Sequence, residues 1–226
     1  MPTCLVAPPA DGLGLGNQAI ELVDMAGLVL DEFQKLSVRV TLSRRPSGLW
    51  AAKRAAISVA RQNGKTPPWV AVVLAGLGLT GCRKQNWTAH EVKTAGEAFE
   101  FITELVMGCA EMRAEVKAVR RTNGQEAIVL KDGRKLQFIA RSKAAGRGFS
   151  AERVVWDEAQ ILPPRTYAAA LPIISSWPNS QQLFAGTAPD VEGDHAEVWR
   201  RLRHEVMTDP DGLTAWLGWC LNDITA

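Results

Sequence analysis

Residues Ala55–Thr66 have the sequence AAISVARQNGKT, and they decide how the rest of the chain is interpreted. Most residues up to Ala60 are apolar, and a polar segment ending in Gly64-Lys65-Thr66 follows at once. This order predicts a buried strand, a phosphate-binding loop and a helix that begins near Lys65. In such a loop, backbone N–H groups face phosphate oxygens, a lysine neutralises the β- and γ-phosphates, and a threonine hydroxyl holds Mg²⁺.

The loop departs from the full pattern G-x-x-x-x-G-K-[ST] at its first position, where Val59 replaces glycine. Pro67 also follows Thr66 directly, at a position where phosphate-binding loops usually offer one more N–H group. A bare Gly-Lys-Thr occurs at ordinary helix starts as well, with a solvated lysine. The interpretation therefore depends on a second motif.

That second motif is the strand-like segment Arg153–Trp156, which runs directly into Asp157 and Glu158. A carboxylate at the end of a buried strand beside a phosphate-binding loop can hold Mg²⁺ or its water shell. The adjacent glutamate can orient or deprotonate an attacking water. Isolated Asp-Glu pairs are common and usually solvated, but a pair that closes an apolar strand downstream of such a loop is much more specific.

Composition indicates a soluble globular protein of 226 residues, 46% of them hydrophobic and 22% charged, long enough for one large α/β domain. No apolar run is long enough to span a bilayer and the N-terminus lacks a signal peptide's basic start, so we expect a cytoplasmic protein without a membrane partner. The cysteines form no C-x-x-C pair, which favours reduced thiols over disulfides or zinc ligands.

Charge is distributed unevenly behind a net charge of +2. Residues 1–34 hold five acidic residues and no Lys or Arg, whereas residues 35–65 hold eight basic residues and no acidic one. Residues 113–153 hold eleven basic against four acidic residues. Two basic segments flanking a nucleotide site suggest a polyanionic partner such as DNA, although such runs are usually solvated faces.

The remaining pattern alternates strands with helices, which predicts an α/β fold with a mainly parallel central sheet flanked by helices. Residues 1–16 read as a loose leader, so we expect residues 1–28 to be a leader with a short helix and 29–226 to be the main domain. The expected helices are 17–28, 30–42, one after Thr66, 90–107, one that the Pro163-Pro164 pair begins and one near 198–202. The expected strands are 55–60, 86–89, 115–121, 125–130, 134–140, 153–156 and 181–185.

Taken together, the motifs resemble the ATPase domain of the large terminase subunit of tailed bacteriophages, a P-loop NTPase of the ASCE (RecA-like) type. The segments that carry the resemblance occur in the family's order over most of the chain: LDEFQ (30–34), ARQNGKT (60–66, Walker A), TAHE with KTA (88–95), GRG (146–148), VWDEAQ (155–160, Walker B) and GTA (186–188). The replaced first glycine is ordinary in terminases.

The resemblance implies a role for each matching position. The nucleotide-binding residues would be Gln34, Arg61, Gln62, Asn63, Gly64, Lys65 and Thr66. Gln34 resembles the glutamine that reads adenine, and Arg61 the loop residue that reaches the γ-phosphate. Thr66 and Asp157 resemble the Mg²⁺ ligands, Glu158 the catalytic carboxylate, and Thr187 part of the coupling motif that senses hydrolysis. Arg147 is placed as an arginine finger donated to the neighbouring subunit, with Arg141 and Lys143 as alternatives.

The implied function is the ATP- and Mg²⁺-dependent motor that moves double-stranded DNA into the procapsid. Its implied partners are the portal protein, the small terminase subunit and further copies of the chain in a ring on the portal, the isolated chain being monomeric. It would act in the host bacterial cytoplasm and transiently at the procapsid portal. Terminases continue into a nuclease domain, so we expect this chain to be either the ATPase half of a longer protein or a naturally short one, and we expect no nuclease activity from it. The alternatives are a helicase-like DNA-dependent ATPase and a nucleotide-binding assembly module without turnover.

Overall fold

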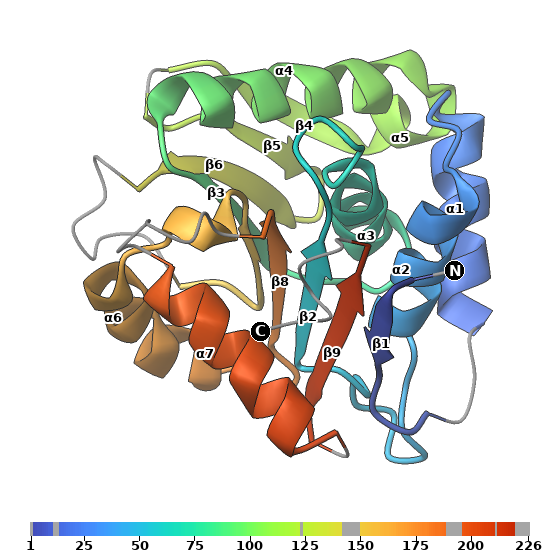
Figure 1. Cartoon of the computed structure of the whole chain (residues 1–226). Coiled ribbons are helices and arrows are strands. Elements are labelled where there is room, and N and C mark those ends of the chain that lie inside the picture. Colours follow the sequence, from blue (N-terminus) through green and yellow to red (C-terminus); the bar gives the residue numbers. More distant parts are fainter. Residues whose placement is uncertain are drawn as a thin grey trace.

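The computed structural model describes residues 2–10, 14–122, 124–141, 150–188, 196–210 and 212–219. In these ranges, helices cover both faces of a nine-stranded sheet (Figure 1). The strands are β1 (Cys4–Val6), β2 (Arg54–Ser58), β3 (Lys84–Ala89), β4 (Val116–Arg120), β5 (Ala127–Leu130), β6 (Lys135–Ala140), β7 (Arg153–Trp156), β8 (Gln181–Gly186) and β9 (Thr214–Gly218). Their order across the sheet is β1-β9-β2-β8-β7-β3-β6-β5-β4.

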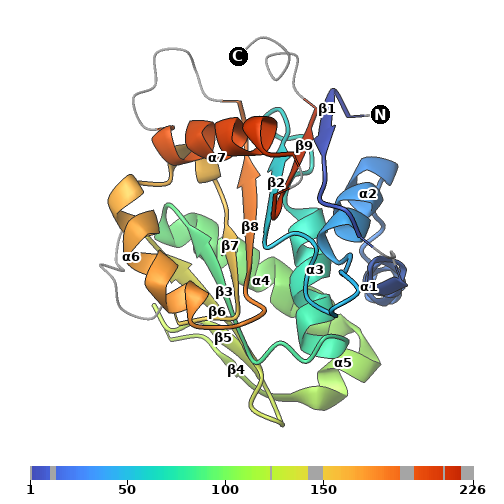
Figure 2. The ribbon, with the colours of Figure 1, turned by 90° about the horizontal axis from the view of Figure 1, so that it is seen from below.

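The helices lie in two layers. They are α1 (Gly14–Met25), α2 (Glu32–Thr41), α3 (Pro67–Gly78), α4 (Val92–Gly108), α5 (Ala110–Glu115), the 3-10 turn η1 (Ala159–Ile161), α6 (Pro164–Ser175) and α7 (Glu197–Thr208). Figure 2 shows α6 and α7 on one side of the central strands and α1, α2 and α3 on the other. None of the helices in the described ranges is long and apolar enough to cross a bilayer.

The central strands from β9 to β6 are all parallel, whereas β1, β5 and β4 pair antiparallel at the two edges. Each parallel strand is followed by a loop at the same edge of the sheet, because parallel strands point the same way. The phosphate-binding loop after β2, the acidic pair after β7 and Thr187 after β8 therefore share one edge. Ligands bind in α/β sheets at this carboxyl edge.

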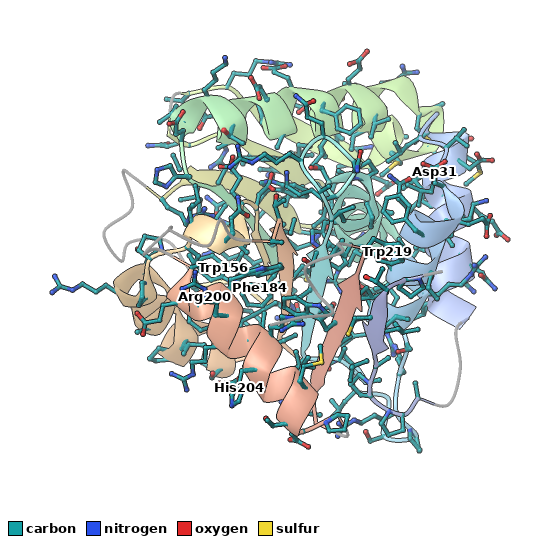
Figure 3. The ribbon with its side chains drawn as sticks, viewed as in Figure 1. Asp31, Trp156, Phe184, Arg200, His204 and Trp219 are labelled. Atoms are coloured by element: carbon teal, nitrogen blue, oxygen red, sulfur yellow. The ribbon has the colours of Figure 1, made fainter. Side chains whose placement is uncertain are left out.

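Strand residues alternate between two hydrophobic cores, as the period of two in a strand requires. Ala55 and Ile57 of β2 pack in the core under α1–α4, whereas Ala56 between them packs in the core under α6 and α7. Trp156 and Phe184 of adjacent strands stack in the second core with ring centroids 6.4 Å apart, and both lie close to α7 in Figure 3. Burial on both faces fixes the register of the central strands.

The prediction of a loose leader up to residue 16 is wrong at Cys4–Val6, which forms β1 and pairs with β9. Three residues are too few for a periodic signal, and the partner strand lies more than 200 residues away. Strand β9 and the short helix α5 were also not predicted. The remaining predicted elements are confirmed within a few residues at their ends.

Candidate functional site: a nucleotide site at the carboxyl edge of the sheet

The phosphate-binding loop connects β2 to α3 through two left-handed residues, Gln62 with φ of 62° and Gly64 with φ of 69°. Left-handed residues within a turn let successive backbone N–H groups converge on an anion. Glycine adopts this conformation without strain, but glutamine does so only when its surroundings hold it there. Gln62, Asn63 and Arg61 are exposed, whereas Gly64, Lys65 and Thr66 are half-buried. The loop thus presents its apex to solvent and its lysine to the sheet.

Gln34 braces this loop from α2. Its Nε2 donates to the Gly64 carbonyl oxygen at 2.9 Å, and its Oε1 accepts from the Asp31 N–H at 2.8 Å in the capping box of α2. A Cβ on Gly64 would lie only 2.7 Å from the same Nε2, so a larger residue here would displace the Gln34 amide, and the left-handed backbone of Gly64 would strain it as well. The predicted adenine contact of Gln34 stays a prediction, since these bonds direct its amide to the loop and to the cap.

Two prolines begin α3. Pro67 and Pro68 occupy its first positions and carry no N–H group. The next two amides, of Trp69 and Val70, both donate to the Thr66 carbonyl oxygen at 3.1 Å. The first amides of α3 are therefore missing or used within the helix, and phosphate oxygens would have to be bound by amides of the loop itself.

Asp157 lies at the end of β7 and is only 5% exposed. Its N–H donates to the Thr88 carbonyl oxygen, and its Oδ1 accepts from the Glu158 N–H, both at 2.9 Å. Burial raises the pKa of the Asp157 carboxyl, and the nearby charge of Lys65 is the strongest influence that lowers it. The loop that carries Lys65 and the strand end that carries Asp157 thus lie at the same edge of the sheet, and the charge of Lys65 acts on the Asp157 carboxyl.

Glu158 has a left-handed backbone, with φ of 52° and ψ of 50°, and its side chain is half-buried. Such a conformation is uncommon for a residue with a Cβ and is concentrated at functional sites. Two residues later, Gln160 accepts a hydrogen bond from the Thr187 N–H through its Oε1 at 3.3 Å. This bond joins the segment after β7 to the segment after β8, where the coupling motif was predicted.

Arg141 follows β6 and is a residue of this site whose position the sequence did not predict. It is buried, and its Nη1 donates to the Asp157 carbonyl oxygen at 2.8 Å. Burial lowers the pKa of its guanidinium to about 10, while the charges of Asp157 and Glu158 oppose that shift. A guanidinium enclosed by its own chain does not suit a finger donated to a neighbour. Arg147, the preferred finger, and Lys143 lie outside the described residues.

The donor set suits Mg²⁺. Asp157 is buried with a raised pKa, so a cation beside it would offset the cost of its charge. Carboxylate and hydroxyl oxygens are ligands that Mg²⁺ accepts, and Thr66 and Asp157 would supply them. No group of three or more His, Cys, Asp or Glu residues that could hold a metal ion occurs among the described residues.

Comparison with known structures identifies the fold. The HK97 bacteriophage large terminase superimposes with a TM-score of 0.73 at 17% identity over 90% of this chain. The ATPase domain of the Thermus phage P74-26 large terminase gives 0.62 at 19% identity over 76% of this chain and 70% of that domain. The fold is that of a large-terminase ATPase domain. No protein-family model and no curated protein matches the sequence.

A further neighbour with the terminase fold is the large terminase of a thermophilic bacteriophage in complex with ADP. It gives a TM-score of 0.57 at 12% identity, over 86% of this chain and 46% of that one. The chain spans 43% of the length of the HK97 large terminase. At these identities the likeness establishes the fold alone.

Proposed function

We propose that this chain is the ATP-hydrolysing motor domain of a viral terminase large subunit, which drives translocation of double-stranded DNA into the procapsid. The observation that carries the proposal is the shared carboxyl edge of the sheet, where the loop with Lys65 after β2 and the buried Asp157 after β7 both lie, within a fold shared with large-terminase ATPase domains.

The chemistry follows from the positions of these side chains. The amides of the loop and the ammonium of Lys65 would bind the β- and γ-phosphates, and Thr66 and Asp157 would hold Mg²⁺. Bound Mg²⁺ neutralises charge on the phosphates. Glu158 accepts a proton from the attacking water, and its fixed backbone limits where the carboxylate can lie. Gln160 then passes a change at Glu158 to Thr187 at the end of β8.

The DNA-facing surface is proposed at the β4–β5 edge of the sheet. Lys117, Arg120 and Lys131 are exposed there, on the side of the sheet far from β1. Two residues of the other basic segment are engaged within the chain: Arg54 pairs with Glu205 at 2.7 Å, and Arg44 stacks over Trp50 at 4.7 Å. Contacts to phosphates alone predict binding that weakens steeply with salt and depends little on base sequence.

The portal protein, the small terminase subunit and further copies of the chain in a ring are proposed partners, in the host bacterial cytoplasm and transiently at the procapsid portal. An arginine finger donated in trans is worth about 10³–10⁵ in rate, so the dilute chain should be a slow ATPase. Its specific activity should rise with protein concentration or on a portal ring.

The deciding experiment is ATP hydrolysis measured with and without double-stranded DNA, for wild type and for Glu158→Gln. We expect DNA to stimulate the wild type, and Glu158→Gln to bind ATP but not to turn it over. Lys65→Ala should instead lose nucleotide binding. Binding without turnover in the wild type, under conditions that permit assembly, would indicate a nucleotide-binding module. Stimulation combined with strand separation would indicate a helicase-like enzyme.

A further inference from the structure

Arg141 occupies an unusual position for a buried arginine. In the sheet order β7-β3-β6, it follows β6 and its side chain reaches across the end of β3 to the end of β7. It bonds there to main-chain oxygens and to the Thr88 hydroxyl, and to no carboxylate among the described residues.

The peptide group between Asp157 and Glu158 is held at both ends. Its carbonyl oxygen accepts from Arg141 Nη1 at 2.8 Å, and its N–H donates to Asp157 Oδ1 at 2.9 Å. The next carbonyl oxygen, that of Glu158, accepts from Arg141 Nη2 at 3.4 Å. Arg141 thus contacts the main chain on both sides of the Glu158 Cα. The backbone of Glu158 is left-handed, a conformation that needs support from its surroundings.

Thr88 extends the arrangement to the intervening strand. Arg141 Nη1 also lies 3.2 Å from the Thr88 carbonyl oxygen and 3.3 Å from its hydroxyl, and that hydroxyl donates to the Val155 carbonyl oxygen at 2.8 Å. The ends of β6, β3 and β7 are therefore tied together at one guanidinium.

Burying Arg141 costs free energy of folding, so the stability of the fold does not by itself explain why a guanidinium lies here. Arg141 Nε is buried and has no acceptor among the described residues, and burial disfavours the charged guanidinium. An incompletely satisfied buried cation generally destabilises a fold. Arg141 imposes this energetic cost at the place where it contacts the segment that carries the proposed catalytic carboxylate.

We propose that Arg141 is a positioning residue that acts in its own subunit: its guanidinium fixes the Asp157–Glu158 peptide and thereby places the Glu158 carboxylate for the attacking water. This inference rests on the proposed ATPase function. It assigns to Arg141 a role in cis, in place of a finger donated to a neighbouring subunit.

The test compares Arg141→Lys with Arg153→Lys. Arg153 is also buried and bonded to a main-chain oxygen, with Nη1 2.9 Å from the Val72 carbonyl oxygen, but it lies at the opposite end of β7. We expect Arg141→Lys to lower kcat about 10- to 100-fold with little change in ADP affinity, because misplaced catalytic groups cost rate before binding. Arg153→Lys should lower thermal stability while leaving kcat per folded molecule unchanged.

Two further measurements separate positioning from other roles. Amide hydrogen exchange at Glu158 should accelerate in Arg141→Lys and not in Arg153→Lys. An equimolar mixture of Arg141→Lys with Glu158→Gln should be no more active than the sum of its parts, because neither chain holds a complete site. If Arg141→Lys does not fold, Arg141→Gln, which retains a donor amide, replaces it in all three assays.

The outcomes are distinct. Restored activity in the mixture would make Arg141 a trans-acting finger, and an unchanged kcat or unchanged exchange at Glu158 would overturn the proposal. A parallel loss of ADP affinity, kcat and thermal stability would reduce Arg141 to a structural residue. Absence of ATP hydrolysis in the wild type would instead count against the proposed function, and the exchange measurement would still decide whether Arg141 holds the peptide.

Discussion

Gln34→Glu tests whether the glutamine of α2 supports the phosphate-binding loop. The variant is nearly isosteric, and its carboxylate can still accept the Asp31 N–H, so the cap of α2 is preserved. Its second oxygen, however, would face the Gly64 carbonyl oxygen at the position where Nε2 now donates at 2.9 Å. The hydrogen bond between residue 34 and the Gly64 carbonyl oxygen is thereby replaced by two acceptors that face each other. Water cannot easily relieve this repulsion, because Gln34 is only 6% exposed.

The magnitude follows from this exchange. Loss of a neutral hydrogen bond costs about 0.5–1.5 kcal/mol, and a buried acceptor left unsatisfied costs about 1–3 kcal/mol. The loop can relieve the repulsion by moving away from its phosphate-binding geometry, so most of the cost should emerge as lost affinity. Since each 1.4 kcal/mol is a factor of ten, nucleotide affinity should fall about 10- to 100-fold.

The assay is equilibrium binding of ATP and GTP to wild type, Gln34→Glu and Lys35→Ala. Lys35 is the adjacent residue and pairs with Glu32 on α2, away from the loop, so its loss should leave affinity unchanged. Support of the loop predicts parallel losses for both nucleotides. A loss confined to ATP would show that Gln34 reads adenine, as the terminase resemblance implies, and unchanged affinities would refute both roles.

Three other perturbations test separate parts of the structure. Pro67→Thr supplies an N–H group at the first position of α3. A hydrogen bond from it is worth about 0.5–1.5 kcal/mol, or more to a charged phosphate, so ADP binding should tighten several-fold. Unchanged affinity would mean that this position does not face the phosphates. Gly76→Ala would place a Cβ against the Gln85 Oε1 and 2.6 Å from Arg153 Nη1, and should lower the free energy of unfolding by about 1–3 kcal/mol in denaturant titrations. The control Gly96→Ala, with open space around its Cβ in α4, should raise it by about 0.5–1 kcal/mol. Burial raises the pKa of the Cys82 thiol to about 12, so the unfolded chain loses this proton first as pH rises. Between about pH 9 and 12 the thiol should therefore lower the free energy of unfolding by up to about 1.4 kcal/mol per pH unit. Guanidinium unfolding at pH 8.5 and 10.5 would detect this slope, and Cys82→Ala should remove it.

The sequence determined the elements whose signals are local. Ala55–Thr66 predicted β2, the loop and the start of α3, because an apolar run, a glycine and a helix start follow one another within a dozen residues. Arg153–Trp156 predicted β7 with the same bounds that the structure shows. Since parallel strands end at the same edge of a sheet, the predicted parallel sheet was sufficient to place the loop after β2 and the acidic pair after β7 on one edge.

Only the tertiary structure decided the contacts between distant segments. Cys4–Val6 forms a strand because β9 offers it an edge, and neither segment carries a periodic signal long enough to predict that pairing. Gln34 meets Gly64 and Arg141 meets Asp157 across turns whose geometry no local pattern encodes. The physical reason is the distance along the chain over which each kind of signal acts. Propensity and hydrophobic period act over a few residues, whereas the bonds that brace the loop and the acidic pair depend on which strand ends lie side by side.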